Sequence, residues 1–115
     1  MKEFKKYDNT MRVKIGNIEY EGEPSYFEVM AGKSAEIIKN TGAKIASGEA
    51  SKEVIDNATS ELISIVDNFF GENSVNKMLE KENIYFHDMC DIFVYIQKAV
   101  LQFEAEKTAL YKQYD

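Results

Sequence analysis

The chain has 115 residues, 44% of them hydrophobic and 30% charged, and its formal net charge is -6. This length fits one domain, and this hydrophobic content is typical of a folded protein rather than a disordered one. A single cysteine, Cys90, excludes an internal disulfide, and the sequence has neither a signal-peptide pattern nor a run of about 20 apolar residues. We therefore expect one soluble, cytoplasmic domain over residues 1–115, with no association with membranes.

The charge is distributed unevenly along the chain. Residues 1–14 contain five basic and two acidic residues, whereas the remainder contains nine basic and 18 acidic ones. An acidic body repels phosphate backbones, so nucleic acid is not the expected partner. For residues 1–10 we expect a flexible N-terminus, as is common at chain ends.

Residues 11–30 favour a β-hairpin followed by an extended region. Apolar and charged residues alternate from Arg12 to Glu21, and Gly16-Asn17 is a two-residue sequence that accepts positive φ. A two-residue loop pairs Ile15 with Ile18 and Val13 with Tyr20, which places all four side chains on one face. After Pro24, residues 25–30 (SYFEVM) favour a short third strand.

The apolar period changes to about 3.6 residues at Ser34, which predicts a helical bundle over residues 34–113. Ser34 is the predicted N-cap of the first helix, Gly42 a possible break, and Gly48 its end. A second helix is predicted from Ser51 to Gly71. A short third helix then starts near 73 or 74, with residues 75, 78 and 79 pointing inward.

The last predicted helix is the longest and runs from 86 or 88 to about 112, with Asp88 as its N-cap. Positions at alternating steps of four and three form a heptad-like seam that is broken only by Lys107, and its apolar residues are Met89, Phe93, Ile96, Val100, Phe103, Leu110 and Tyr114. The fold class expected from these elements is mostly α (α+β): an N-terminal β-hairpin followed by a bundle of about four helices with a long C-terminal helix. The far half of this helix extends beyond a small domain and is available for self-association.

The sequence offers little for catalysis. His87 and Cys90 stand three residues apart, but no second Cys/His cluster completes a zinc site. Phosphate-binding glycine motifs are absent from the sequence, and the paired carboxylates fall on the exposed faces of the predicted helices. We expect no catalytic residues, no metal and no cofactor, and an interaction protein rather than an enzyme.

The middle of the chain carries a more specific pattern, in which an amphipathic helix ends in two phenylalanines and a glycine, and an acidic, aromatic helix follows. Its segments are 67–74 (DNFFGENS), 75–79 (VNKML), Asn83 and 88–96 (DMCDIFVYI). Residues 50–100 thereby resemble tail assembly chaperones of phages and prophages of Gram-positive bacteria, in which glycine is common at the position of Asn73 and Phe at that of Leu79. The resemblance implies that the chain coats the long helical tape measure protein until tail-tube subunits replace it.

From this resemblance and the apolar pattern we predict a partner-binding surface that combines the Phe69–Phe70 corner with the stripe of the last helix. Its predicted residues are Phe69, Phe70, Phe93, Ile96, Val100, Phe103, Leu110 and Tyr111. For Phe93 and Ile96 a place in the monomer core is the favoured interpretation, whereas Phe103, Leu110 and Tyr111 fit the core and an interface about equally well. Two alternative functions stay open: a head–tail connector, which forms a ring of fixed size, and a bacterial regulatory protein that dimerises through its last helix.

Overall fold

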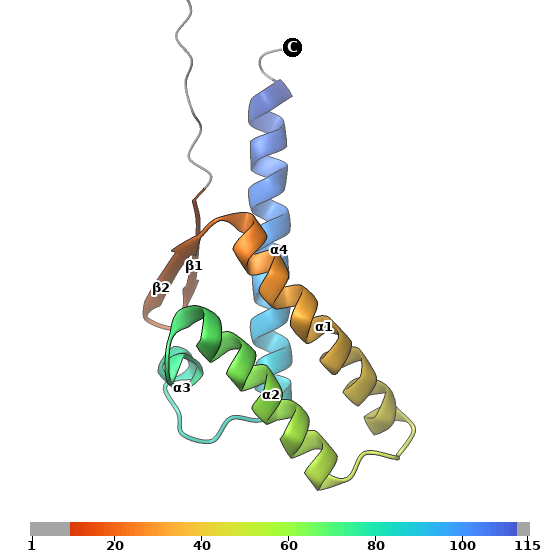
Figure 1. Cartoon of the computed structure of the whole chain (residues 1–115). Coiled ribbons are helices and arrows are strands. Elements are labelled where there is room, and N and C mark those ends of the chain that lie inside the picture. The colour runs from red at the N-terminus through yellow and green to blue at the C-terminus, as the bar shows by residue number, and fades with distance from the viewer. Residues whose placement is uncertain (1–9, 113–115) are drawn as a thin grey trace, which may run out of the picture.

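The computed structural model describes residues 10–112, with side chains up to residue 110. A two-stranded antiparallel hairpin is followed by four helices, the last of them long, as the sequence predicts (Figure 1). The elements are β1 (Met11–Ile15), β2 (Ile18–Gly22), α1 (Pro24–Ala46), α2 (Lys52–Phe70), α3 (Ser74–Leu79) and α4 (Phe86–Lys112). The prediction of a flexible segment at residues 1–10 falls almost entirely outside the described residues.

The hairpin has the predicted register, with Ile15 opposite Ile18 and Val13 opposite Tyr20. Gly16 in the turn has φ +63°, and a Cβ placed there would lie only 2.2 Å from the carbonyl oxygen of Met78 in α3. Next to it, the Asn17 side-chain amide donates to Glu80 Oε1 at 2.7 Å. The turn is therefore shaped by its glycine and also packed directly against the end of α3.

Helix α1 starts ten residues earlier than predicted, and the third strand is absent. Pro24 occupies the first turn, where its fixed φ suits a helix and its missing N–H removes no hydrogen bond. Phe27 and Ser34 are both completely buried on the inner side of this helix. Ser34 is thus an interior residue, whose hydroxyl donates to the carbonyl of Ala31 at 2.8 Å, and not an N-cap. The helix also continues through Gly42 and ends before Gly48, which has φ +76°.

Helices α2 and α3 are joined by a sharp turn that Asp67 stabilises. Ser51 caps the start of α2 as predicted, by accepting a hydrogen bond from the N–H of Val54, and α2 ends at Gly71, which has φ +114°. Asp67 Oδ1 accepts hydrogen bonds from the Ser74 hydroxyl at 2.8 Å and from the Val75 N–H at 3.2 Å. An aspartate from the preceding helix therefore supplies the cap of α3, in place of the predicted cap at 73 or 74.

Asn73 occupies the turn between the two helices. It has φ +60°, a left-handed conformation that asparagine and glycine both adopt readily. The backbone at this position therefore favours a small set of residues, of which asparagine is one.

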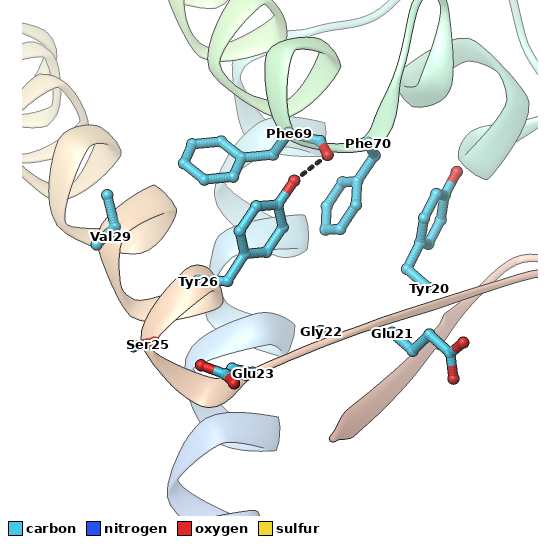
Figure 2. A pocket seen from close by; sticks show the side chains of 9 residues that line it. All are labelled: Tyr20, Glu21, Gly22, Glu23, Ser25, Tyr26, Val29, Phe69 and Phe70. Atoms are coloured by element: carbon cyan, nitrogen blue, oxygen red, sulfur yellow. Dashed lines mark hydrogen bonds between the residues drawn. The ribbon is translucent and has the colours of Figure 1, made fainter. Parts of the chain in front are cut away.

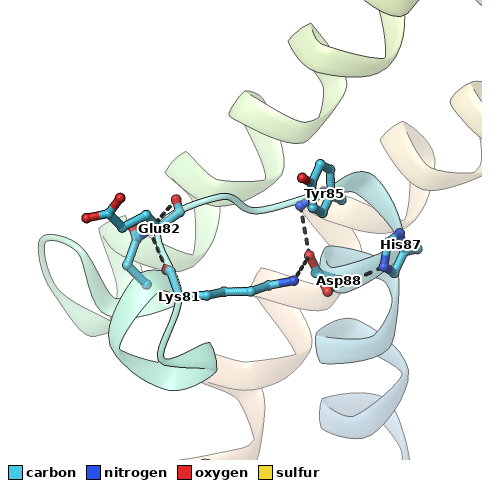
Figure 3. A network of polar contacts seen from close by, with 6 residues as sticks. Lys81, Glu82, Tyr85, His87 and Asp88 are labelled. Carbon is cyan, nitrogen blue, oxygen red and sulfur yellow. Dashed lines mark hydrogen bonds and ion pairs between the residues drawn. The ribbon is translucent and has the colours of Figure 1, made fainter.

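The start of α4 is organised by Asp88 in a way that differs from a simple N-cap (Figure 3). The helix begins at Phe86, and Asp88 Oδ2 reaches back to accept the N–H of Tyr85 at 2.8 Å, as the acidic residue of a capping box does. Lys81 Nζ lies 2.7 Å from the same oxygen. Burial opposes ionisation of this carboxyl, but Lys81, the Tyr85 N–H and His87 outweigh it, so the pKa of Asp88 lies below its ordinary value.

The core lies where the hairpin, α1, α2 and α3 meet α4. Its buried side chains come from every element except β2, whose Tyr20 is partly buried and packs against them, and they are Met11, Val13, Phe27, Met30, Leu62, Val66, Val75, Met78, Met89, Ile92, Phe93, Ile96 and Val100. Helix α4 is the central element, since it contacts α1, α2 and β1, and its far end extends past α1 (Figure 1). The hairpin covers the core with one face, as an isolated hairpin requires for stability.

Candidate partner-binding surfaces

Three of the predicted partner-binding residues lie in the core. Phe93, Ile96 and Val100 are 2%, 0% and 6% exposed, and they pack against the other elements of the bundle. In this conformation they offer a partner almost no surface. The side chains that α4 turns to solvent lie on a different part of the helix, and they include Val94 and Leu101.

The remaining predicted residues of α4 lie further along the helix. Phe103 is partly buried and packs against the edge of the core, and Leu110 is also partly buried. The side chain of Tyr111 lies outside the described residues. Their role in partner binding stays a prediction.

Phe69 and Phe70 belong to an aromatic cluster, which we call the aromatic corner, at the C-terminal end of α2 (Figure 2). Its members come from β2, α1 and α2, and they are Tyr20, Tyr26, Phe27, Phe69 and Phe70. The Tyr20 and Phe70 rings have centroids 4.3 Å apart, and Tyr26 meets the Phe69 ring edge-on at 4.6 Å. Sequence reasoning found only the two phenylalanines, because β2 and the start of α1 are brought to them by the tertiary fold.

A hydrogen bond fixes the corner. The Tyr26 hydroxyl donates to the carbonyl oxygen of Phe69, in the last turn of α2, where helix carbonyls have no intrahelical partner. Burial raises the pKa of Tyr26 above its ordinary value, and burial together with the nearby Asp67 carboxylate raises that of Tyr20. Both hydroxyls therefore remain neutral at physiological pH, and Tyr26 keeps its proton for this bond.

The aromatic corner opens onto a cavity of about 700 Å³. The cavity is bordered by side chains of β2, α1 and α2, as Figure 2 shows, and its lining residues are Tyr20, Glu21, Gly22, Glu23, Ser25, Tyr26, Val29, Phe69 and Phe70. Glu21 and Glu23 are exposed at its rim, and Val29 is 53% exposed. Lys33 Nζ lies 5.7 Å from the centre of the Phe69 ring.

An aromatic floor with an acidic rim is suited to binding peptide side chains. Aromatic rings offer a large, rigid apolar surface, and the exposed Glu23 carboxylate attracts a basic residue next to the bound apolar one, whereas Glu21 is already paired with Arg12 at 3.2 Å. The volume lies within the range of sites that hold small ligands or side chains. The raised pKa values of Tyr20 and Tyr26 give their hydroxyls no activation as nucleophiles or bases.

A second hollow surface, not predicted from the sequence, lies between α1 and α4. Two hollows of about 470 and 200 Å³ share Ala31, Ala35 and Gln97 and so lie next to each other, and together we call them the α1–α4 groove. One end is lined by Glu28, Gly32, Val100 and Leu101, and the other by Ser34, Ile38, Lys39, Cys90, Phe93 and Val94. The groove shares no lining residue with the aromatic corner.

Three further features of the described part of the chain concern a metal site, a reactive thiol and a membrane-spanning helix. No group of three or more His, Cys, Asp and Glu residues within residues 10–110 is placed to hold a metal ion. Burial and the neighbouring Asp91 raise the pKa of Cys90, which keeps the thiol protonated and unreactive near pH 7. None of the described helices is both long enough and apolar enough to cross a membrane.

Comparison with known proteins yields no match, whether to models of protein families, to curated proteins or to solved structures. The features that bear on function are therefore the two surfaces and the sequence pattern around Phe69 and Phe70.

Proposed function

We propose that this chain is a protein-binding module of the tail assembly chaperone type, which keeps a tape measure protein in solution during assembly of a phage tail. The observation that carries the binding role is the aromatic corner, whose 700 Å³ cavity is bordered by Glu21 and Glu23. The choice of partner rests on the resemblance of residues 50–100 to that family. The net charge of -6 adds to it, since an acidic coat keeps the covered chain soluble.

The binding step follows from the chemistry of the cavity. A long, partly apolar helical chain aggregates when it is bare, and covering its apolar side chains with small soluble proteins prevents this. An apolar side chain of the partner fills the cavity and contacts Phe69 and Phe70, while a neighbouring basic residue pairs with Glu23. Many copies bind along one partner, because each copy covers only a short segment.

Co-expression with a long helical protein that is insoluble alone tests this function. We expect that protein to become soluble in a many-to-one complex with the present chain. Val29→Glu and Glu23→Lys alter the cavity without touching the core, and each should reduce the amount of soluble complex several-fold. Tyr95→Glu is the matched control, since Tyr95 is 44% exposed on α4 and belongs to neither surface.

The alternatives give different results in the same experiment. If the long protein stays insoluble while this chain alone forms a ring of fixed size, the chain is a connector. If it stays insoluble and the chain forms only a dimer, the chain is a regulatory protein. A dimer together with a solubilised partner agrees with the chaperone function, so solubilisation of the partner decides between them.

A further inference from the structure

The α1–α4 groove is built to receive protruding side chains. Between Glu28 and Ile38, the residues of α1 that line the groove are all small, and they are Ala31, Gly32, Ser34 and Ala35. A Cβ added at Gly32 would find no atom within 4 Å, so this stretch is open. At one end of the groove Leu101 is 70% exposed, and Val94 near the other end is 47% exposed. Exposed leucine and valine beside an open hollow indicate a contact surface.

The same face therefore carries both a protruding side chain and a hollow. Such a face can pair with a second copy about a two-fold axis, because each copy presents the same patch and the protruding side chain of one copy enters the hollow of the other. Ala35 and Gln97 line both hollows and so mark the middle of the groove. A two-fold axis at that point places Leu101 of one copy over the hollow beside Val94 and Ile38 of the other.

The charges at the two ends select this antiparallel arrangement. Glu28 lines the end near Leu101, and Lys39 lines the end near Cys90. They are eleven positions apart on α1, or about 16 Å at 1.5 Å per residue. Neither belongs to an ion pair among the described residues. An antiparallel second copy places its Lys39 against Glu28 at one end and its Glu28 against Lys39 at the other, whereas a parallel copy would juxtapose like charges.

We propose that the α1–α4 groove is a self-association surface, in which a second copy of this chain packs antiparallel about a two-fold axis near Ala35 and Gln97. The groove is short, so the buried area falls in the class of small, transient interfaces, below about 1,200 Å² in total. We therefore expect dissociation constants of tens of micromolar or weaker, on the order of 10⁻⁵ to 10⁻⁴ M. The aromatic corner remains open in this dimer, because the two surfaces have no residue in common.

Sedimentation equilibrium of the purified chain alone, at concentrations on both sides of the expected range, tests the proposal. The mass should rise with concentration from 13.2 kDa towards twice that value. Leu101→Glu should remain monomeric throughout, whereas Tyr95→Glu, on the opposite side of α4, should associate like the unaltered chain. Circular dichroism confirms that both variants are folded. A chain that stays monomeric at the highest concentration, or two variants with equal effects, overturns the proposal.

Charge reversal tests the antiparallel direction. Glu28→Lys and Lys39→Glu should each weaken association about 3- to 10-fold, and the double variant should restore it, because the pairs are re-formed with opposite signs. If the double variant is as weak as the singles or weaker, the antiparallel arrangement is wrong.

A disulfide test locates the axis. In a Cys90→Ser background, Gln97→Cys should form a cross-linked dimer under mild oxidation, because the two copies meet at this position. Tyr95→Cys, on the far side of the helix, should remain monomeric. Equal cross-linking of the two variants would place the contact elsewhere and overturn the proposal. Because no partner protein is present in any of these experiments, their outcome is independent of the proposed chaperone function.

Discussion

Two glycines show how differently the parts of this molecule are packed. At Gly16 in the hairpin turn, an added Cβ would come within 2.2 Å of the Met78 carbonyl oxygen, so backbone meets backbone there. At Gly32 in α1, an added Cβ would meet no atom within 4 Å. The first glycine is needed by the fold, and the second leaves the α1–α4 groove open. Tight packing therefore marks the parts that hold the structure together, whereas open space beside exposed apolar residues marks the parts available to other molecules.

Substitution of these two glycines by alanine should change the free energy of unfolding in opposite directions. The effect at Gly16 should be the largest of all the predicted effects. Gly16→Ala combines a positive φ with a backbone clash, and we expect it to lower the free energy of unfolding by about 2 kcal/mol or more. Gly32→Ala in an open part of α1 should raise it by about 0.5–1 kcal/mol. Urea denaturation followed by circular dichroism measures both, and a small effect at Gly16 would show that the turn moves easily away from α3.

Removal of the Asp67 carboxylate should have the next largest effect. Asp67→Ala leaves the Ser74 hydroxyl and the Val75 N–H without their acceptor, so α3 loses its cap. We expect a loss of about 1–2 kcal/mol in the free energy of unfolding. Asp56→Ala is the control, because Asp56 makes only an exposed ion pair with Lys52, and such pairs contribute little. Equal losses in the two variants would rule out a special role for Asp67.

Tyr26→Phe tests whether the Tyr26 hydroxyl contributes to stability, to partner binding or to both. The variant retains the ring but loses the hydrogen bond to the Phe69 carbonyl, and we expect a loss of about 1 kcal/mol. Because the ring still lines the cavity, partner capture in the co-expression experiment should change little. Loss of capture without loss of stability would show that the hydroxyl itself contacts the partner.

The smallest effect should be the pH dependence due to Asp88. Its pKa is lower in the folded chain than in the unfolded one, so its contribution to stability is present above the unfolded value, about 4, and disappears as the pH falls below it. Asp88→Asn should therefore be less stable than the unaltered chain at pH 7, with a difference that shrinks from about pH 5 downwards. Urea denaturation at a series of pH values measures this difference. A difference that stays constant with pH would show that Lys81 and Tyr85 do not stabilise the ionised carboxylate.

The sequence predicted the structure correctly where the turn or cap residues and the apolar period agreed on the same element. In the hairpin, alternation and the Gly16-Asn17 turn agree on one register, and for α2 the cap at Ser51, the apolar period and Gly71 agree on both ends. The start of α1 was predicted wrongly because Pro24 is compatible with two structures. It interrupts a strand, and it also opens a helix well, and six residues are too few to separate the two periods.

The candidate sites also contain some residues that the sequence indicates and others that only the fold brings together. Phe69 and Phe70 stand out in the sequence as two aromatic residues before a glycine, but Tyr26 reaches them only through the packing of α1 on α2. The α1–α4 groove gave no signal, because alanine and glycine create it by being small and contribute little to an apolar pattern. Val94 and Leu101 lie beside the main stripe of α4 and so did not stand out in it.

The sequence by itself determined the hairpin register, the mostly helical class and most of the elements, α2 and the long α4 among them, because these depend on backbone conformation and side-chain period over a few neighbouring residues. Only the tertiary structure decided which apolar side chains remain accessible. Phe93, Ile96 and Val100 have the same pattern as a partner-binding stripe, yet α1, α2 and β1 cover the helix that carries them. Burial depends on segments far away in the chain, and periodicity shows that a face is apolar without showing what covers it.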